Sequence, residues 1–378
     1  METKNRYDAV VVGAGIIGLA HAYHLVRAGQ RVLVVERGQR AVGASIRNFG
    51  MVWPIGQPPG KMYEMALRSR EIWLDVLSEA GIWHERCGSM HLAYHQYEAD
   101  VLVEFEEKAG ALGYGCQFIP PSGVTLRSPA VRREGLLGAL WSPTELCVSP
   151  RQTTASLPDY LTSLGVEIRF GTAVSAIESN GVVAGGQQIR SDRILLCTGD
   201  DFETLFPGLF AESGLNRCKL QMMKLRHGRT GFRIGTHLCA GLTLGHYANF
   251  KVCESLPGAL ERIYRQHPSY ECYGIHLLVS QHEDGCLTVG DSHEYGLAPD
   301  PFLKQEIDQL ILDYLNTFLD TSEFDVTERW SGVYAKHKEL PYFVSDPIPG
   351  VRVVTGVGGA GMTLSFGLAE EQTRDLVA

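Results

Sequence analysis

The sequence of residues 9–18 is Ala9-Val-Val-Val-Gly-Ala-Gly-Ile-Ile-Gly18, and it constrains the fold more strongly than any other stretch of the 378-residue chain. Its first four residues are apolar and mostly β-branched, which suits a strand buried on both faces. The glycines follow the pattern G-x-G-x-x-G, residues 17–28 have helical spacing, and residues 31–35 form a second apolar run. This order of strand, turn, helix and strand predicts one β-α-β unit over residues 7–37 that binds a dinucleotide.

Each glycine of the turn has its own role in such a unit. Gly13 permits the turn, Gly15 lets a pyrophosphate approach the backbone, and Gly18 lets the helix pack on the strand. The phosphates then lie at the helix N-terminus, beside the amides of Ile16 and Ile17. The alternative is that these glycines serve chain geometry alone.

An acidic residue ends the second strand of the unit. Glu36 would accept hydrogen bonds from ribose hydroxyls, and Arg37 follows it in the sequence. A carboxylate at this position repels a 2′-phosphate, so the pattern argues against NADP. We expect both residues to border the cofactor.

A second strand, glycine turn and helix lie at residues 351–376. The turn is Gly356-Val-Gly-Gly-Ala-Gly361. A flavin needs N–H donors or a helix N-terminus near its N1/C2 edge, whereas a nicotinamide enzyme of this class would end with its catalytic domain. The sequence therefore favours FAD over NAD, although an ordinary C-terminal helix with a glycine hinge is the alternative. The residues expected to contact the flavin are Gly358, Gly359, Ala360, Gly361, Met362 and Thr363.

Composition excludes several classes of protein. Apolar residues make up 44% of the chain and charged residues 20%, which indicates a globular protein rather than a disordered one. The net charge of −9 and the lack of a basic run argue against nucleic-acid binding. The nine cysteines include no C-x-x-C pair, so we expect no metal site and a cytoplasmic location. No apolar run is long enough to cross a membrane.

Further elements are expected along the chain from hydrophobic periodicity. Helices are predicted at residues 63–79, 99–112, 153–164 and 300–319. Strands are predicted at residues 167–170, 174–178, 193–197, 219–225, 242–245, 275–280, 286–289 and 351–355. Residues 54–60 are too rich in proline and glycine for either a helix or a strand.

Four motifs together resemble the family of D-amino-acid oxidase, glycine oxidase and sarcosine oxidase. They are the N-terminal unit, Gly43-Ala-Ser-Ile-Arg-Asn-Phe-Gly50, Cys197-Thr-Gly199 and Gly358-Gly-Ala-Gly-Met-Thr363. The resemblance implies an α/β fold in which a Rossmann-like FAD-binding domain is interleaved with an α+β substrate domain built on an antiparallel sheet. The FAD-binding domain would comprise residues 1–85, 145–215 and 325–378, and the substrate domain residues 86–144 and 216–324.

The same resemblance implies where FAD is held. Ser45 and Asn48 would lie along the pyrophosphate and flavin, and Val174 would meet the adenine through its backbone. Arg47 would pair with the phosphates or cap a helix start. The other positions carried over from these motifs are Ala44, Phe49, Gly50, Thr198 and Gly199.

The chain departs from this family at two points. The segment Arg329-Trp-Ser-Gly-Val-Tyr-Ala-Lys-His337 has Tyr334 where members that take simple amino acids have an arginine for the carboxylate. It also lacks the cysteine through which sarcosine oxidases tether their flavin, so we expect FAD to be non-covalent.

These departures resemble a narrower subgroup associated with bacterial 2-aminoethylphosphonate breakdown. The segments that carry this likeness are Gly241-Leu-Thr-Leu-Gly-His-Tyr247, Gly290-Asp-Ser-His-Glu-Tyr295 and Gly361-Met-Thr-Leu-Ser-Phe-Gly-Leu-Ala-Glu-Glu371. The substrate would be the phosphonate amine or its N-alkyl form, oxidised at its carbon-nitrogen bond to an imine that hydrolyses to an aldehyde and an amine. O2 would reoxidise the flavin and give H2O2.

Four residues are candidates for the substrate site. Lys336 could hold an anionic group or sit near the flavin, Tyr334 takes the place of the arginine, and Tyr247 and His293 could border the substrate. The alternatives are a surface lysine in a loop and a structural histidine. Other functions left open are oxidation of glycine, sarcosine or a D-amino acid, a quinone-linked dehydrogenase, and a flavoprotein without turnover.

Overall fold

A six-stranded, mostly parallel sheet forms the first layer of the computed structural model, which describes residues 5–178 and 180–377. The strand order is β10-β3-β2-β14-β22-β21, and only β21 runs antiparallel to its neighbour. The strands are β2 (Ala9–Val12), β3 (Val32–Val35), β10 (Glu167–Arg169), β14 (Ile194–Leu196), β21 (Phe343–Ile348) and β22 (Val351–Thr355).

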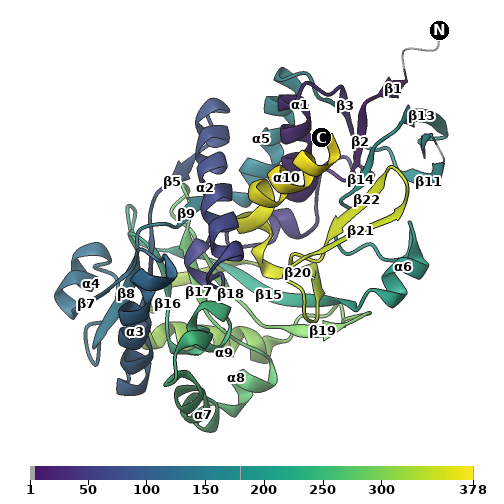
Figure 1. The fold of residues 1–378 in the computed structure, drawn as a ribbon. Coiled ribbons are helices and arrows are strands. Elements are labelled where there is room, and N and C mark those ends of the chain that lie inside the picture. The colour runs from purple at the N-terminus through teal and green to yellow at the C-terminus, as the bar shows by residue number, and fades with distance from the viewer. Residues whose placement is uncertain (1–4, 179, 378) are drawn as a thin grey trace.

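Helices cover one face of this sheet. They are α1 (Ile16–Arg27), α2 (Lys61–Glu79), α5 (Pro150–Ser163) and α10 (Gly361–Val377). Figure 1 shows that α10, at the C-terminal end of the chain, lies beside α1 near the N-terminal end, and α10 also packs on α2. The Trp73 indole of α2 donates a hydrogen bond of 2.8 Å to the Met362 carbonyl, which fixes the start of α10.

Smaller elements cover the opposite face and the edge of the first sheet. Val11 faces the helices, whereas Val10 packs with a four-stranded sheet in the order β1-β13-β12-β11. These strands are β1 (Arg6–Tyr7), β11 (Val174–Glu178), β12 (Gly181–Ala184) and β13 (Gln187–Ser191), and α6 (Pro207–Glu212) lies nearby. A three-stranded sheet consists of β4 (Met51–Val52), β9 (Leu146–Val148) and β5 (His84–Glu85).

A nine-stranded, mainly antiparallel sheet forms the second layer (Figure 1). Its longest strands, β15 and β20, pair along most of their length, and only β6 and β16 pair in parallel. The strands are β6 (Ser89–Ala93), β7 (Gln117–Ile119), β8 (Gly138–Ser142), β15 (Leu215–His227), β16 (His237–Cys239), β17 (Leu278–Gln281), β18 (Leu287–Gly290), β19 (Glu294–Gly296) and β20 (Phe324–His337).

The helices around this second sheet are mostly amphipathic. In α9, Ile307, Ile311 and Leu315 are buried in a core with Met223 and Val289 of the sheet. The helices are α3 (Gln96–Ala109), α4 (Pro121–Arg127), α7 (Leu256–Gln266), α8 (Pro268–Cys272) and α9 (Gln305–Phe318). Short 3-10 helices are η1 (Ala44–Ile46), η2 (Pro54–Gly56), η3 (Gly110–Leu112), η4 (Gly241–Gly245), η5 (Ala248–Val252) and η6 (Gly358–Ala360).

The α/β fold class is confirmed, and so are most elements expected from the sequence. Strands at residues 9–12, 174–178 and 351–355 have the expected bounds. The strand predicted at residues 242–245 is wrong, because this stretch belongs to η4. There the Leu242 amide donates to the Tyr314 hydroxyl, 3.0 Å away, instead of to a neighbouring strand. The domain boundaries stay a prediction.

Candidate active site

A cavity of about 850 Å³ runs from the turn between β2 and α1 to the start of α10 and to the face of the second sheet. Most cofactor positions expected from the sequence line it, together with all four expected substrate positions. The cofactor positions in its wall are Gly13, Gly15, Ile16, Ile17, Glu36, Arg37, Ala44, Ser45, Arg47, Asn48, Phe49, Val174, Thr198, Gly199, Gly358, Gly359, Ala360, Gly361, Met362 and Thr363. Gly18 and Gly50 are not among the lining residues.

The first glycine turn leaves no room for side chains at two of its positions. A Cβ on Gly13, whose φ is 105°, would lie 2.5 Å from the Cys197 carbonyl oxygen. A Cβ on Gly18 would lie 2.0 Å from the Gly13 carbonyl oxygen, so Gly18 acts through helix packing. A Cβ on Gly15 would stand 3.2 Å from the Ser45 hydroxyl at the cavity wall. The turn thus brings bare backbone to the cavity at the N-terminus of α1, where anions are favoured.

The Glu36 carboxylate closes this end of the cavity. One oxygen accepts a hydrogen bond from the Ala14 amide at 2.9 Å, and the other accepts one from the Gly38 amide at 2.8 Å. Each oxygen retains a lone pair that a ribose hydroxyl could use. Arg37 forms an ion pair with Asp201, with 2.6 Å between Nη1 and Oδ2.

Side chains of residues 44–50 line the cavity, and some of them also form hydrogen bonds to the backbone of the same segment or of α1. The Ser45 hydroxyl accepts a hydrogen bond of 2.9 Å from the Ile16 amide in the first turn of α1. The Asn48 side-chain nitrogen donates to the Ala44 and Ser45 carbonyls, and its oxygen accepts from the Gly50 amide. Asn48 therefore positions this loop through its own amide group. Gly50 has a φ of 69°, and a Cβ there would lie 2.0 Å from the Val148 carbonyl oxygen.

Three further cofactor positions border the cavity between its ends. Val174 begins β11, and Thr198 and Gly199 follow β14. The Gly199 carbonyl accepts a hydrogen bond of 2.6 Å from the Thr355 hydroxyl, which ties the turn after β14 to the end of β22.

The second glycine turn, η6 and the start of α10, lies against β20. A Cβ on Gly359 would be 3.6 Å from the Tyr334 hydroxyl, and one on Gly358 would be 3.6 Å from Cγ of Lys336. Thr363 in the first turn of α10 accepts a hydrogen bond of 2.9 Å from the Trp53 amide. The amides at the start of α10 and the side chains of β20 therefore face one part of the cavity.

Lys336 lies within β20, so the alternative that it is a surface lysine in a loop is wrong. Its Nζ is 3.4 Å from the Tyr295 hydroxyl and 5.5 Å from the centre of that ring. Burial raises the pKa of the Tyr334 phenol well above its ordinary value. This wall therefore places the Lys336 side chain beside a neutral phenol, and both can donate hydrogen bonds to an oxyanion.

Tyr247 precedes η5 on another wall of the cavity. Its ring stacks on Trp53, with 5.9 Å between the ring centroids. Burial also raises the pKa of the Tyr247 phenol well above its ordinary value, so it stays a neutral donor. A Cβ on Gly56 would lie 2.6 Å from Tyr247 and 2.5 Å from Trp53, so Gly56 allows this aromatic pair to form.

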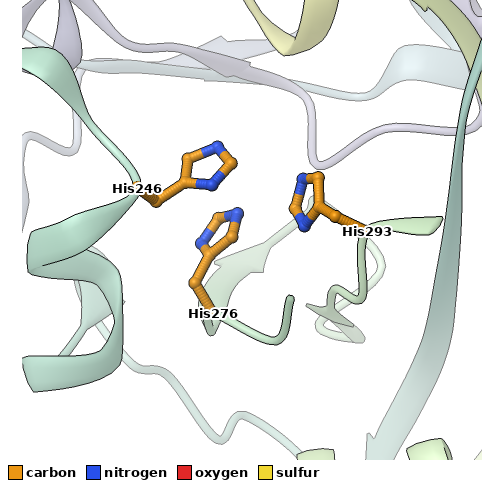
Figure 2. A group of neighbouring side chains, drawn as sticks. All are labelled: His246, His276 and His293. Carbon is orange, nitrogen blue, oxygen red and sulfur yellow. The ribbon is translucent and has the colours of Figure 1, made fainter. Parts of the chain in front are cut away.

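His293 belongs to a cluster of three histidines that Figure 2 shows turned toward one another. The ring centroids are 3.6 Å apart for His246 and His276, 4.7 Å for His246 and His293, and 5.0 Å for His276 and His293. Asp291 adds a buried carboxylate, with Oδ1 3.0 Å from Nε2 of His276. Sequence reasoning missed three of these four residues, although the motifs that suggested Tyr247 and His293 also contain His246 and Asp291.

The cluster is better suited to an organic group than to a metal ion. The nearest ring nitrogens of the three histidines lie within 4.8 Å of one another. However, the rings of His246 and His276 are stacked with 3.6 Å between centroids and an interplanar angle of 25°, so one ion cannot easily lie in the planes of both rings. Burial lowers the pKa of His293 to about 4, so its ring is neutral at pH 7.

The wall of the cavity fits FAD. Two helix N-termini, those of α1 and α10, open into the same cavity, and glycine backbone lines both approaches. These are the features that a pyrophosphate and the polar edge of a flavin require. Trp53 also lines this cavity, and its indole nitrogen is buried without a hydrogen-bond partner. Within residues 5–178 and 180–377, no helix is both long and apolar enough to cross a bilayer.

Comparison with known proteins points to the same cofactor. Residues 8–374 match the family described as FAD dependent oxidoreductase. The chain is 28% identical over 196 residues to glycine oxidase of Bacillus licheniformis, which covers 50% of this chain and 51% of that protein. It is 28% identical over 198 residues to 4-methylaminobutanoate oxidase (formaldehyde-forming) of Paenarthrobacter nicotinovorans, covering 50% of this chain and 24% of that protein. The matches thus span about half or less of these relatives.

Solved structures share the fold over nearly the whole chain. The structure of glycine oxidase from Geobacillus kaustophilus superposes with a TM-score of 0.79 at 20% identity, covering 99% of this chain and 95% of that one. The structure of L-proline dehydrogenase from P. horikoshii gives a TM-score of 0.78 at 18% identity, covering 99% and 94%. At these identities the likeness concerns the fold.

Proposed function

Because the chain belongs to the DAO family of FAD-dependent oxidoreductases, we propose that it oxidises the carbon-nitrogen bond of a small anionic amine. The substrate class is 2-aminoethylphosphonate or its N-alkyl derivatives. The product imine hydrolyses to an aldehyde and an amine, and O2 takes the electrons as H2O2. The proposed site is the cavity, in a cytoplasmic protein.

A single observation carries this proposal. The cavity that joins the two glycine turns also contains Lys336, Tyr334 and Tyr247. Near the start of α10, a lysine and a neutral phenol replace the planar guanidinium that suits a carboxylate. Dispersed donors of this kind suit the tetrahedral oxygens of a phosphonate. Arg47 also lines the cavity, but its Nη1 donates to the Ser331 carbonyl at 3.2 Å.

The residues that would hold FAD follow from the wall of the cavity. The amides at the start of α1 and Ser45 suit the pyrophosphate, Glu36 the ribose, Val174 the adenine, and the start of α10 the flavin. With no cysteine in the segment at residues 329–337, the cofactor is proposed to be non-covalent. Bound FAD would supply a two-electron acceptor for the hydride that leaves the substrate carbon.

The protein's own groups would bind and orient the amine. Lys336 would hold the anionic end, with Tyr334 and Tyr247 as hydroxyl donors. The carbon-hydrogen bond breaks while the nitrogen lone pair forms the C=N bond, so the nitrogen must be unprotonated at that moment. Alignment of the carbon-hydrogen bond within the cavity then accounts for much of the rate.

An anaerobic titration of the visible spectrum tests the proposal. The probes are 2-aminoethylphosphonate, N-methyl-2-aminoethylphosphonate, glycine and sarcosine, each added to the purified flavoprotein. Bleaching of the flavin by a phosphonate amine at far lower concentration than by glycine or sarcosine is expected. Bleaching by glycine or sarcosine alone would replace the phosphonate with a carboxylate substrate.

The main alternative functions are other reactions of the same family of FAD-dependent oxidoreductases. Glycine oxidase and D-amino acid dehydrogenase are among the curated relatives, the latter from Methylobacterium radiotolerans. A carboxylate substrate or a quinone acceptor would fit those names. Reoxidation of the reduced protein by air-saturated buffer within seconds, with stoichiometric H2O2, is expected for an oxidase. Slow reoxidation by O2 and fast reoxidation by a soluble quinone would indicate a dehydrogenase.

A further inference from the structure

Asp291 is a buried acidic residue in the wall of the proposed substrate cavity. It comes directly after β18, and its side chain is only 4% exposed. Two backbone hydrogen bonds hold it there: the Asp291 amide donates to the His276 carbonyl at 2.9 Å, and the His276 amide donates to the Asp291 carbonyl at 3.3 Å. The backbone therefore fixes where this carboxylate meets the cavity.

The Asp291 carboxylate accepts no hydrogen bond within residues 5–178 and 180–377. Oδ1 lies 3.0 Å from Nε2 of His276, but the geometry of this contact is not that of a hydrogen bond, and Oδ1 is enclosed without a partner. Oδ2 is therefore the carboxylate oxygen that a ligand in the cavity could reach. Burying a charged group without a partner costs much free energy, so an unpartnered acid in the wall of a cavity indicates that a ligand provides the partner.

The other acidic residues that line the cavity have partners within the protein. Glu36 accepts hydrogen bonds from two backbone amides. Asp201 forms an ion pair with Arg37 at 2.6 Å, and Asp200 lies 3.4 Å from the guanidinium of an arginine in β15. In the described part of the chain, Asp291 is thus the acid of the cavity wall that is left for a cationic ligand.

Lys336 lines the same cavity and does not pair with Asp291. Among the described residues, its Nζ contacts the Tyr295 hydroxyl at 3.4 Å and forms no ion pair. Both charges nevertheless act on one ring. Burial lowers the pKa of His293 to about 4, the charge of Asp291 opposes this shift, and the charge of Lys336 adds to it. One part of the cavity therefore holds an acid and a base that leave room for a ligand between them.

We propose that Asp291 binds the ammonium group of the substrate, while Lys336 binds its anionic end. The inference rests on the proposed amine oxidation and adds the residue that selects for an amine. An alkylammonium group has a pKa of about 10 by analogy with lysine, so an aminoalkylphosphonate carries both charges at pH 7. Such a ligand complements a wall that presents a carboxylate and a lysine that are not paired with each other.

The same carboxylate also suits the nitrogen during the oxidation. The ammonium first releases one proton to solvent water, and the neutral amine keeps an N–H group that can donate to Asp291. When the nitrogen lone pair forms the C=N bond, the nitrogen becomes positively charged again. A carboxylate already in place stabilises this charge as it develops. Asp291 would therefore favour both binding and the limiting rate without forming or breaking a bond itself.

The test compares two ligands that differ only at the amine end, 2-aminoethylphosphonate and 2-hydroxyethylphosphonate. For the holoprotein at pH 7, the amine concentration that gives half-maximal flavin reduction is measured anaerobically, and so is the inhibition constant of the hydroxyl analogue. The wild-type protein should prefer the amine by about 10-fold or more, because a hydrogen bond to a charged group is lost with the analogue. Equal affinity of the wild-type protein for both ligands would overturn the proposal without any variant.

Variants of the two charged residues separate the two ends of the ligand. Asp291→Asn should reduce the preference for the amine to less than about threefold and leave the inhibition constant of the hydroxyl analogue nearly unchanged. Lys336→Ala should weaken both ligands by a similar factor and keep the preference. The control is Asp308→Asn, which changes a buried acid that pairs with Arg329 and is not among the residues lining the cavity. It should keep the wild-type preference.

The outcomes distinguish this inference from the proposed function. If Asp291→Asn keeps the preference for the amine, or if Asp308→Asn loses it equally, the role of Asp291 is overturned while the amine oxidation stands. If glycine reduces the wild-type flavin and the phosphonate amine does not, glycine and glycolate replace the two phosphonates and test Asp291 in the same way. If no amine reduces the wild-type flavin, the proposed function fails and this role with it.

Discussion

Glu36 and Ala14 are joined by a hydrogen bond of 2.9 Å from the Ala14 amide to the Glu36 carboxylate. The bond connects the end of β3 to the first glycine turn, and the other carboxylate oxygen holds the Gly38 amide. Glu36 therefore shapes the turn as well as offering lone pairs to a ribose. The Glu36 carboxylate thus has two roles: it fixes the backbone of the first glycine turn, and it can bind the ribose of the cofactor.

Glu36→Ala should weaken FAD binding by about 10-fold to 100-fold, because hydrogen bonds to a charged group contribute roughly 1.5–3 kcal/mol. The dissociation constant is measured by fluorescence during titration of the apoprotein with FAD. Glu107→Ala, at an exposed position of α3, serves as the control and should bind FAD as the wild-type protein does. Full retention of flavin by Glu36→Ala through prolonged dialysis would contradict the assigned role.

Lys336→Ala should raise the concentration of phosphonate amine needed for half-maximal flavin reduction by about 10-fold or more. Removing the ammonium group takes away a charge-assisted hydrogen bond to an anionic substrate. The visible spectrum and FAD content should be those of the wild-type protein. Lys336→Arg keeps the charge and should recover part of the affinity. Wild-type kinetics in Lys336→Ala would remove this residue from the substrate site.

Tyr247→Phe removes one hydroxyl and keeps the ring that stacks on Trp53. Loss of a neutral hydrogen bond predicts a reduction of roughly threefold to tenfold in kcat/KM for the phosphonate amine, equivalent to about 0.5–1.5 kcal/mol. Steady-state oxygen consumption measures the change. The melting temperature of the holoprotein should stay close to that of the wild-type protein. Unaltered kcat/KM would show that the phenol makes no contact with substrate.

Sequence reasoning predicted the nucleotide end of the site well, because its chemistry is local. Gly13, Gly15 and Glu36 lie on one β-α-β unit, so the spacing along the chain determines their arrangement. Gly18 was also predicted to act through packing, and the Cβ distance of 2.0 Å to the Gly13 oxygen supports that expectation. The sequence motif placed Asn48 beside the cofactor but did not predict its structural role. Its hydrogen bonds to the Ala44 and Ser45 carbonyls are seen only in the folded loop.

The substrate end could not be predicted to the same degree, because tertiary structure assembles it. His246 follows η4, His276 precedes β17, and Asp291 follows β18, so no short spacing along the chain connects them. The same limit explains the error at residues 242–245. An apolar stretch this short suits a buried strand or a buried turn, and the Tyr314 hydroxyl decides between them.

Acid should destabilise the fold through buried neutral histidines, of which His21 in α1 is the most direct test. Its side chain is fully buried, and burial lowers the pKa of His21 to about 4 from 6.5. Between these values the unfolded chain binds a proton that the folded protein does not, so stability is lost as the pH falls from about 6.5 toward 4. For one group the loss between pH 7 and pH 5 is about 2 kcal/mol.

His21→Leu removes the titrating group from the core beside α10. Urea unfolding of wild-type protein and variant at pH 8, 7, 6 and 5 gives the free energy of unfolding at each pH. The variant loses the hydrogen bond between His21 Nδ1 and the Ile17 carbonyl, so it should be less stable at pH 8. From pH 8 to pH 5, the free energy of unfolding of the wild-type protein should fall by about 2 kcal/mol relative to that of the variant, because only the wild-type protein loses stability through this group. The wild-type advantage should therefore shrink or be reversed at pH 5. A difference that stays constant over the four pH values would show that the pKa of His21 is the same in the folded protein as in the unfolded chain.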